Sequence, residues 1–531
     1  MLKKIASFLA AILAVSLSPR ATHAPRVPKA RRHPPRARHQ VGPEEAPYSL
    51  LEDDVTAASG TPFKGLWLLK SMPKWLRTIA RPEHLKAALE RSIPEFVSGA
   101  MALEQARATR RRLEEGVFGG TFELTVRGPD GARRLVCLRG VADPTRPLLA
   151  DAFTPNVPFG EYGWRGAVPE LRLVLETPPA DAALPALAML ADPSRARVFL
   201  EGAIRAGLPA HADIRIEACQ PKVLRYKFGS RCTMLCRLEY GPEATGRGWP
   251  EAVVVKTHRG RKGRVAYEAM RALWETELRS STAVTIAEPL AFIPELRVLI
   301  QRALPHGSML NDLLTTVLPG GTAGGREELR AQLAKTARGL AALHACTARG
   351  TMFTFEEQMA EARGRIVALA TWIPGFDGAL APTLARLDAL AASHPPDRPV
   401  PSHRSFRPTQ VLLHEGHIAF IDFDGFCEAE PAMDLALFRA SLRKNVMRLG
   451  SSAGPPGPFP DLLSALDGLC DLFLDEYARV APVSRERVTL WETLYLLDSV
   501  LNSWNKLEPD LLESSMVLLD RHVRQSRLSL A

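Results

Sequence analysis

A loop, a tight hairpin and an acidic turn, all within residues 399–436, constrain this sequence more than any other stretch. Residues 411–413 and 418–421 are short apolar runs separated by a Glu-Gly pair, which predicts two antiparallel strands joined by a turn. Gln410 directly precedes the first strand and Asp422 directly follows the second. Because a hairpin brings its two ends together, we expect an amide oxygen and a carboxylate oxygen to lie side by side. These oxygen types bind divalent cations that carry phosphate.

The same residues resemble the catalytic and metal-binding loops of the aminoglycoside phosphotransferase and choline kinase-like families. The family pattern is His-Gly-Asp-x-x-Pro-x-Asn-Val-Leu, followed by Ile-Asp-Phe/Trp-Asp/Glu. The positions that carry the family's residue are His403, Pro408, Val411, Leu412, Ile421, Asp422 and Asp434. Three positions differ: Arg404 replaces a glycine, Ser405 replaces the catalytic aspartate, and Gln410 replaces a metal-binding asparagine.

The resemblance implies an α+β chain with a two-lobed protein-kinase-like fold. Its small lobe is built on an antiparallel sheet, and its large lobe is mainly helical. The resemblance also implies ATP and Mg²⁺ as cofactors, with Gln410 and Asp422 as the metal ligands. His403 and Asp434 are expected to order the loop structurally, and Asp424 is a candidate second ligand or proton acceptor.

The substitution at Ser405 leaves two functions open. A positioned general base contributes typically about 10²–10⁴-fold to a rate, and a serine hydroxyl does not accept a proton at neutral pH. In the first alternative the chain is a phosphotransferase acting on a hydroxyl of a small molecule. Ser405 is then an imperfect catalytic substitute or a contact to the acceptor hydroxyl. In the second, the chain is a pseudokinase that binds nucleotide or metabolite without efficient catalysis.

The segment upstream of this block predicts the nucleotide-binding lobe. The predicted strand 251–256 ends at Lys256, a turn containing Gly229 precedes it, and a helix carrying Glu268 follows. The resemblance implies that the Gly229 turn covers the nucleotide phosphates, that Lys256 binds them, and that Glu268 pairs with Lys256, with Glu275 in reserve. A lone lysine at a strand end is commonly a plain sheet-edge charge. The order of the elements favours the nucleotide role.

The predicted strand 298–304 is apolar and contains nothing specific for adenine. The resemblance implies that backbone groups around Gln301 and Ala303 read the edge of the base. Residues 353–392, which in related kinases help to form the acceptor pocket, contain no ordered acidic cluster of the kind that binds a polycationic aminoglycoside. The acceptor class therefore stays open.

A helix followed by a hairpin occurs twice in the first half of the chain. Residues 82–93 match residues 193–204 at a constant offset, and the following turns match at a similar one. This favours an internal repeat, with Arg139 at the place of Lys256; chance matching of common helix and turn residues is the alternative. The expected divisions are a basic leader (1–60), an α+β unit that is a degenerate small-lobe copy (61–141), a connecting segment (142–190), the small lobe (191–305) and the large lobe (306–531).

The net charge of +10 comes almost entirely from residues 1–43. Residues 1–43 contain nine Lys and Arg and no Asp or Glu, which leaves 59 basic against 58 acidic residues elsewhere. This balance gives no support to nucleic acid binding by the folded part. The seven scattered cysteines show no zinc spacing and predict reduced thiols, typical of a reducing compartment.

The apolar run at residues 5–17 follows two lysines and suits a signal peptide, but it is too short for a stable membrane span. Export is therefore the alternative to the cytoplasmic location that an ATP-dependent enzyme requires. The expected partners are a nucleotide and a small-molecule acceptor, whose identity, like the oligomeric state, the sequence does not specify.

Overall fold

The computed structural model describes residues 73–114, 116–143, 157–178, 183–227, 229–305, 307–452 and 459–525. The basic leader, with its signal-like run, lies outside these residues. None of the helices within the described ranges combines the length and the apolar character that crossing a bilayer requires.

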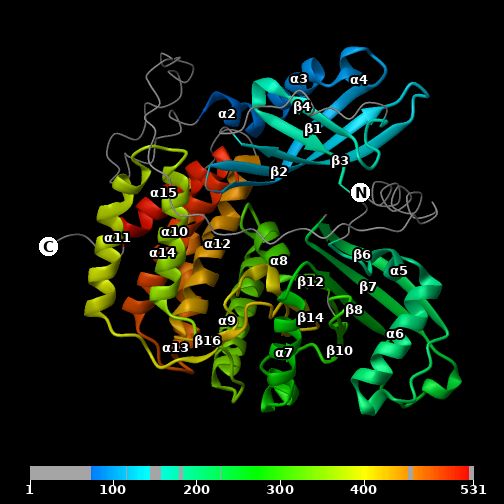
Figure 1. Cartoon of the computed structure of the whole chain (residues 1–531). Helices are drawn as coiled ribbons and strands as arrows, with labels where there is room; N and C mark the ends of the chain where they lie inside the picture. Colours follow the sequence, from blue (N-terminus) through cyan, green and yellow to red (C-terminus); the bar gives the residue numbers. More distant parts are fainter. Residues whose placement is uncertain are drawn as a thin grey trace, which may run out of the picture. The chain divides into compact units, whose positions relative to one another are not determined.

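The small lobe contains a five-stranded antiparallel sheet in the order β10-β11-β8-β7-β6 (Figure 1). Its strands are β6 (Ala218–Lys227), β7 (Arg231–Glu239), β8 (Ala252–His258), β10 (Pro289–Ile293) and β11 (Val298–Arg302). Burial alternates along β7: Cys232, Met234 and Cys236 are buried, whereas Thr233 and Leu235 are half-buried. Successive side chains point to opposite faces of a sheet. One face is therefore core, and the other remains partly open.

Two helices complete the small lobe. Helix α6 (Pro193–Gly207) packs against β6 and β10, and helix α7 (Lys262–Trp274) packs against β8, β10 and β11. In α6, the Asp192 side chain accepts a hydrogen bond from the backbone N–H of Arg195, the usual way to cap a helix N-terminus.

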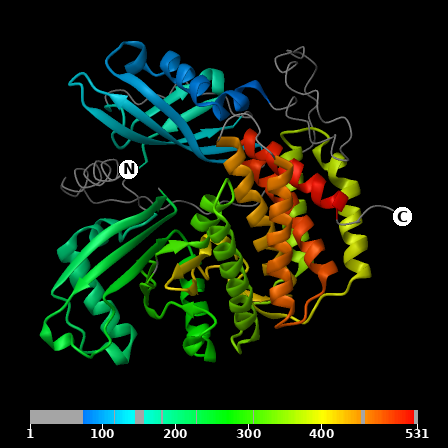
Figure 2. The same ribbon diagram turned by 180° about the vertical axis from the view of Figure 1, so that it is seen from behind.

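The large lobe is mainly helical. Its helices are α8 (Leu310–Val317), α9 (Ala323–Ala345), α10 (Phe355–Ala370), α11 (Phe376–Ser393), α12 (Ala432–Ser452), α13 (Phe459–Ala478), α14 (Arg485–Asn505) and α15 (Pro509–Gln525). Helices α12 to α15, orange to red in Figure 2, pack on one another, and α14 supplies the buried rings of Trp491 and Trp504. With the antiparallel small lobe, this confirms the predicted α+β class.

Short strands connect the large lobe to the predicted catalytic block. One sheet has the order β12-β14-β15-β9 and the other pairs β13 with β16. The strands are β9 (Thr285–Ile286), β12 (Ser308–Met309), β13 (Val400–Ser402), β14 (Val411–His414), β15 (His417–Phe420) and β16 (Cys427–Ala429). The hairpin β14–β15 is the predicted one. Its turn residues Glu415 and Gly416 both have positive φ, at 48° and 78°, as a tight two-residue hairpin turn requires.

The N-terminal unit has its own antiparallel sheet, in the order β1-β2-β3-β5-β4. Its elements are α2 (Lys74–Ala80), α3 (Pro82–Ser92), α4 (Pro94–Val97), β1 (Ala102–Glu114), β2 (Val117–Arg127), β3 (Arg133–Ala142), β4 (Arg165–Val168) and β5 (Leu173–Glu176). A helix followed by three antiparallel strands is also the order of the small lobe. Arg139 lies opposite Thr121, as Lys256 lies opposite Thr233. The two units share this arrangement, and the internal repeat, with the place assigned to Arg139, stays a prediction.

The segment 142–190 differs from the expected connecting segment. Strands β4 and β5 lie within it and extend the N-terminal sheet through β3. Its aromatic residues pack on the same unit: Phe159 contacts Phe96 and Trp164 at ring distances of 5.1 and 4.8 Å. Within the described part of this segment, Pro169 begins the short turn that separates β4 from β5.

All seven cysteines are free thiols, and six of them are buried. Cys232 and Cys236 both lie on the core face of β7. They are four residues apart along an extended strand, which is too far for a disulfide.

Candidate active site

An ion pair joins the two lobes. Lys256 Nζ, near the end of β8, lies 3.2 Å from Asp422 Oδ1, which follows β15. Lys256 is only 9% exposed. Burial alone would raise the pKa of Asp422, but the charge and hydrogen bond of Lys256, with the further charge of Arg231, lower that pKa to about 2. The carboxylate is therefore ionised at neutral pH.

The hairpin brings the two predicted metal ligands together. The backbone N–H of Ile421 donates to the carbonyl of Gln410 at 3.1 Å, which places Gln410 beside the residue that precedes Asp422. The φ of Asp422 is 76°, a left-handed conformation that costs a non-glycine residue about 1–3 kcal/mol. Such strain persists where the surrounding structure holds it, and it is concentrated at functional sites.

The side-chain amide of Gln410 has two polar atoms, of which one makes a hydrogen bond and the other does not. Its Nε2 donates to Ser405 Oγ at 3.3 Å, and only 9% of the residue is exposed. Its Oε1 is buried and has no hydrogen-bond partner within the described part of the chain. A buried acceptor without a partner is unfavourable by about 1–3 kcal/mol. A divalent cation or its bound water would satisfy this oxygen, so Gln410 and Asp422 fit a Mg²⁺ site in donor chemistry.

Ser405 lies between Gln410 and His403. His403 Nε2 is 3.0 Å from the carbonyl oxygen of Ile421, which can only accept, so Nε2 carries a proton and Nδ1 of the neutral ring is an acceptor. Ser405 Oγ lies 3.2 Å from that Nδ1 and donates to it. The hydroxyl also receives the Gln410 amide and keeps one lone pair for a further hydrogen bond.

Asp434 orders the loop that carries Ser405, and His344 contacts Asp434. Asp434 is fully buried, and its Oδ2 accepts the backbone N–H of His403 at 2.6 Å. His344 Nε2 lies 3.3 Å from the same oxygen, and its Nδ1 is 2.7 Å from the hydroxyl of Tyr477. These contacts fix the start of the loop that carries Ser405.

Arg404 keeps the left-handed backbone, with a φ of 61°, at the position where the family pattern has glycine. Its guanidinium carbon lies 3.6 Å from the centroid of the Phe353 ring, and its Nη2 lies 3.2 Å from Glu361 Oε1. The loop conformation is therefore retained despite the side chain. Arg404 contacts Phe353 and helix α10, and Arg407, the other arginine of the loop, is exposed.

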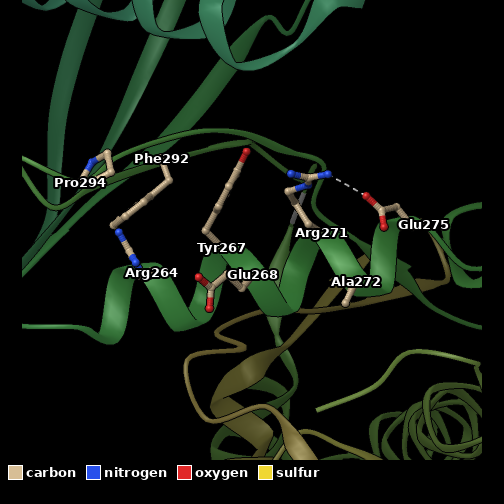
Figure 3. A pocket seen from close by; sticks show the side chains of 8 residues that line it. All are labelled: Arg264, Tyr267, Glu268, Arg271, Ala272, Glu275, Phe292 and Pro294. Carbon is tan, nitrogen blue, oxygen red and sulfur yellow. Dashed lines mark hydrogen bonds and ion pairs between the residues drawn. The ribbon is translucent and has the colours of Figure 1, made fainter. Parts of the chain in front are cut away.

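The predicted ion pair between Lys256 and Glu268 does not form. Glu268 is exposed and lines a surface pocket of about 480 Å³ on helix α7, together with Tyr267 and Phe292 (Figure 3). The reserve candidate, Glu275, pairs with Arg271 at 2.9 Å on the same surface. Residues seven apart share one side of a helix. Because α7 buries the other side, through small and apolar residues, neither acid reaches Lys256, and Asp422 pairs with it instead.

Gln301 shares a sheet face with Lys256. Lys256 lies opposite Leu299, and Val254 lies opposite Gln301, so the two polar side chains point to the same side, two positions apart. Gln301 is 4% exposed, and its Oε1 has no hydrogen-bond partner among the residues described. The backbone N–H of Ala303 donates to the carbonyl of Ala252 at 2.9 Å, so this N–H is already engaged within the sheet.

The structure adds basic residues that the sequence analysis did not single out. Arg231 lies opposite both Lys227 and His258, and Arg225 lies opposite Thr233, the residue that faces Lys256. Residues opposite one another share a face. Arg225, Lys227 and Arg231 therefore flank the Gly229 turn on the open side that carries Lys256. Gly229 itself has a φ of 61°. Alternating basic residues on both sides of a glycine turn are the signal that could have revealed them.

Residues 247–469, rather less than half of the chain, match the model described as the phosphotransferase enzyme family. No curated protein matches the chain in sequence. A thermostable mutant of aminoglycoside phosphotransferase APH(4)-Ia is 16% identical with a TM-score of 0.40, covering 58% of this chain and 96% of that one. Choline kinase from Cryptosporidium parvum Iowa II is 11% identical with a TM-score of 0.42, covering 62% and 95%. A glucosamine kinase is 17% identical with a TM-score of 0.43, covering 85% and 98%.

Proposed function

Because residues 247–469 match the model of the phosphotransferase enzyme family, we propose that the chain catalyses ATP- and Mg²⁺-dependent transfer of phosphate to a hydroxyl of a small molecule. One observation carries this proposal: Lys256 Nζ and Asp422 Oδ1 lie 3.2 Å apart, next to a hairpin that ends in the unpartnered oxygen of Gln410. A lysine and two oxygen ligands are the groups that a metal-bound triphosphate needs. A cytoplasmic location, where ATP is available, goes with this proposal.

The small lobe would bind the nucleotide. The Gly229 turn lies at the end of the open face along which Gln301 and Lys256 point, so a nucleotide there would have its base near Gln301 and Ala303 and its phosphates near Lys256. The buried Gln301 Oε1 would accept a hydrogen bond from the exocyclic amine of adenine. Gln410 and Asp422 would hold Mg²⁺, which neutralises charge on the phosphates during transfer.

In the reaction, the acceptor oxygen forms a bond to the terminal phosphorus while the bond from that phosphorus to the bridging oxygen breaks, releasing ADP. Ser405 would accept a hydrogen bond from the acceptor hydroxyl through its remaining lone pair and so orient it. The hydroxyl proton leaves to the transferred phosphate or to solvent. Phosphoryl transfer has a loose transition state in which positioning contributes more than proton removal, so a serine at this place is compatible with turnover.

Asp424 is a further candidate to accept the proton of the acceptor hydroxyl. Burial and the nearby Asp422 carboxylate raise the pKa of Asp424, which makes it a stronger base than an ordinary aspartate. Replacing it with asparagine removes this basic carboxylate, and the Mg²⁺ dependence of ATP binding to the same variant shows whether Asp424 is instead a metal ligand.

Replacing Ser405 with aspartate is expected to raise ATP turnover by up to about 10²-fold, since it adds a carboxylate where the positioned general base is worth at least that much. The control is Ser405→Asn, which has the same shape without the charge and should show no gain. Turnover is measured with ATP and Mg²⁺ against a panel of hydroxyl acceptors that includes choline and glucosamine. If Ser405→Asp turns over ATP no faster than Ser405→Asn, the missing carboxylate at this position does not limit the rate.

The pseudokinase alternative rests on Ser405 and its contacts. The hydroxyl is held by His403 and Gln410, and no carboxylate occupies the position of the family's catalytic aspartate. Wild-type protein that binds ATP without turning it over, together with activity gained in Ser405→Asp, would establish this alternative. Turnover by wild type that is lost when Asp422 is replaced would exclude it.

A further inference from the structure

An irregularity in strand β1 points one arginine of the N-terminal unit in an unusual direction. Thr109 lies opposite Thr121, and Arg112 lies opposite Gly119. Arg110 and Arg111 therefore both lie opposite a single residue of β2, Gly120. This is a β-bulge, which redirects a side chain and is found next to active sites. Arg110 has a φ of 52°, a left-handed conformation that is unfavourable by about 1–3 kcal/mol for a residue other than glycine.

The guanidinium of Arg110 reaches the glycine turn of the small lobe. A Cβ placed on Gly229 would lie 3.6 Å from Arg110 Nη1. The same strand is fixed three residues later, where the backbone N–H of Leu113 donates to Asn505 Oδ1 at 2.8 Å. Asn505 ends helix α14 and Lys506 follows it. Elements from three parts of the chain therefore meet at this turn.

Five cationic residues come together there. We call them the turn cluster: Arg110, Arg225, Lys227, Arg231 and Lys506. Partial burial lowers the pKa of Lys227, and so do the charges of the other four members, with Arg110 first among them. Their charges therefore repel one another, and a polyanion bound among them would relieve that repulsion. Two members, Lys227 and Arg231, share the open sheet face with Lys256.

We propose that Arg110, supplied by the N-terminal unit, binds the phosphate chain of a nucleoside triphosphate at the Gly229 turn and completes the nucleotide site of the small lobe. This inference rests on the proposed function, because it assigns the turn cluster to the same nucleotide. The bulge holds Arg110 in place for this contact, and the N-terminal unit thereby becomes part of the active site.

The test compares Arg110→Gly with wild type. Glycine adopts the left-handed conformation without strain, so the variant should be at least as stable as wild type in thermal unfolding. Its affinity for ATP with Mg²⁺, measured by calorimetry, should fall by about 10- to 100-fold, the size expected for a lost hydrogen bond to a charged group. Affinity for adenosine should not change. The control is Arg107→Ala on the same strand, an exposed residue paired with Glu123 at 2.8 Å, which should bind ATP as wild type does.

Inorganic tripolyphosphate provides a second readout that needs no nucleotide. It should raise the unfolding temperature of wild type and of Arg107→Ala, and not that of Arg110→Gly. If Arg110→Gly binds ATP and tripolyphosphate like wild type, the inference is overturned and the phosphotransferase proposal stands. If wild type binds tripolyphosphate through Arg110 but binds no ATP, the phosphotransferase proposal fails, and the assignment of the turn cluster to a nucleotide fails with it.

Discussion

Replacing Asp422 with asparagine is expected to lower ATP turnover by about 10²–10³-fold, the size of effect seen when one preorganised charge-stabilising group is removed. Asp422 has two tasks in the proposed site: it is a metal ligand, and it is the charge partner of Lys256 at 3.2 Å. Asparagine keeps the shape and one oxygen but loses the negative charge. Single-turnover measurements with ATP and Mg²⁺ would give the effect directly.

The matched control for this variant lies in the same hairpin. Glu415 is in the β14–β15 turn, its side chain is 82% exposed, and its Oε2 lies 3.8 Å from His414 Nε2. Glu415→Gln removes one negative charge without touching the site and should turn over ATP like wild type. The variant Asp422→Asn leaves the buried Lys256 ammonium without its partner. Its fold is therefore checked by near-ultraviolet circular dichroism, which should match that of wild type. Equal turnover in wild type and a folded Asp422→Asn protein would exclude Asp422 from the reaction.

Replacing Glu430 with glutamine is expected to lower the free energy of unfolding of the large lobe by about 3–5 kcal/mol, the usual effect of breaking a buried ion pair from one side. Glu430 is 5% exposed, accepts from Arg487 Nε at 2.8 Å and from Trp491 Nε1 at 2.5 Å, and also pairs with Arg487 Nη2. Arg487 is 1% exposed, so its charge would have no water to replace the carboxylate. Urea unfolding followed by tryptophan fluorescence measures the change.

An exposed ion pair at the start of α14, the helix that contains Arg487, gives the comparison. Arg485 pairs with Asp475 at 2.6 Å, but their side chains are 55% and 48% exposed. Solvent-exposed pairs contribute typically about 0–1 kcal/mol. Arg485→Ala should therefore change the unfolding free energy of the lobe very little. Similar losses in Glu430→Gln and Arg485→Ala would show that burial does not govern the strength of these pairs.

The hairpin, and with it the approach of Gln410 to Asp422, could be predicted from the sequence because it depends on a short local pattern. Two apolar runs around a Glu-Gly pair determine the register of the hairpin, and the register alone places Gln410 beside the exit strand. The helices of the large lobe could also be predicted, since their apolar periodicity continues over many residues.

Other features depend on contacts between distant segments, and no local pattern specified them. The partner of Lys256 was predicted to be Glu268, but helix α7 turns small residues such as Gly263 and Ala266 inward and its acids outward. The helical spacing of Glu268 and Glu275 was visible in the sequence and would have placed both on the exposed side. The direction of Arg110 was not predictable, because a bulge arises from the pairing of two strands rather than from either one.

One calorimetric titration tests the central claim, that Lys256, Gln410 and Asp422 form a single site for a magnesium-bound nucleotide. ATP is titrated into wild type and into Asp422→Asn, first with Mg²⁺ and then with EDTA. We predict that Mg²⁺ strengthens ATP binding to wild type and has no effect on binding to the variant. Binding of equal strength with and without Mg²⁺ in wild type, or no binding at all, would contradict the claim.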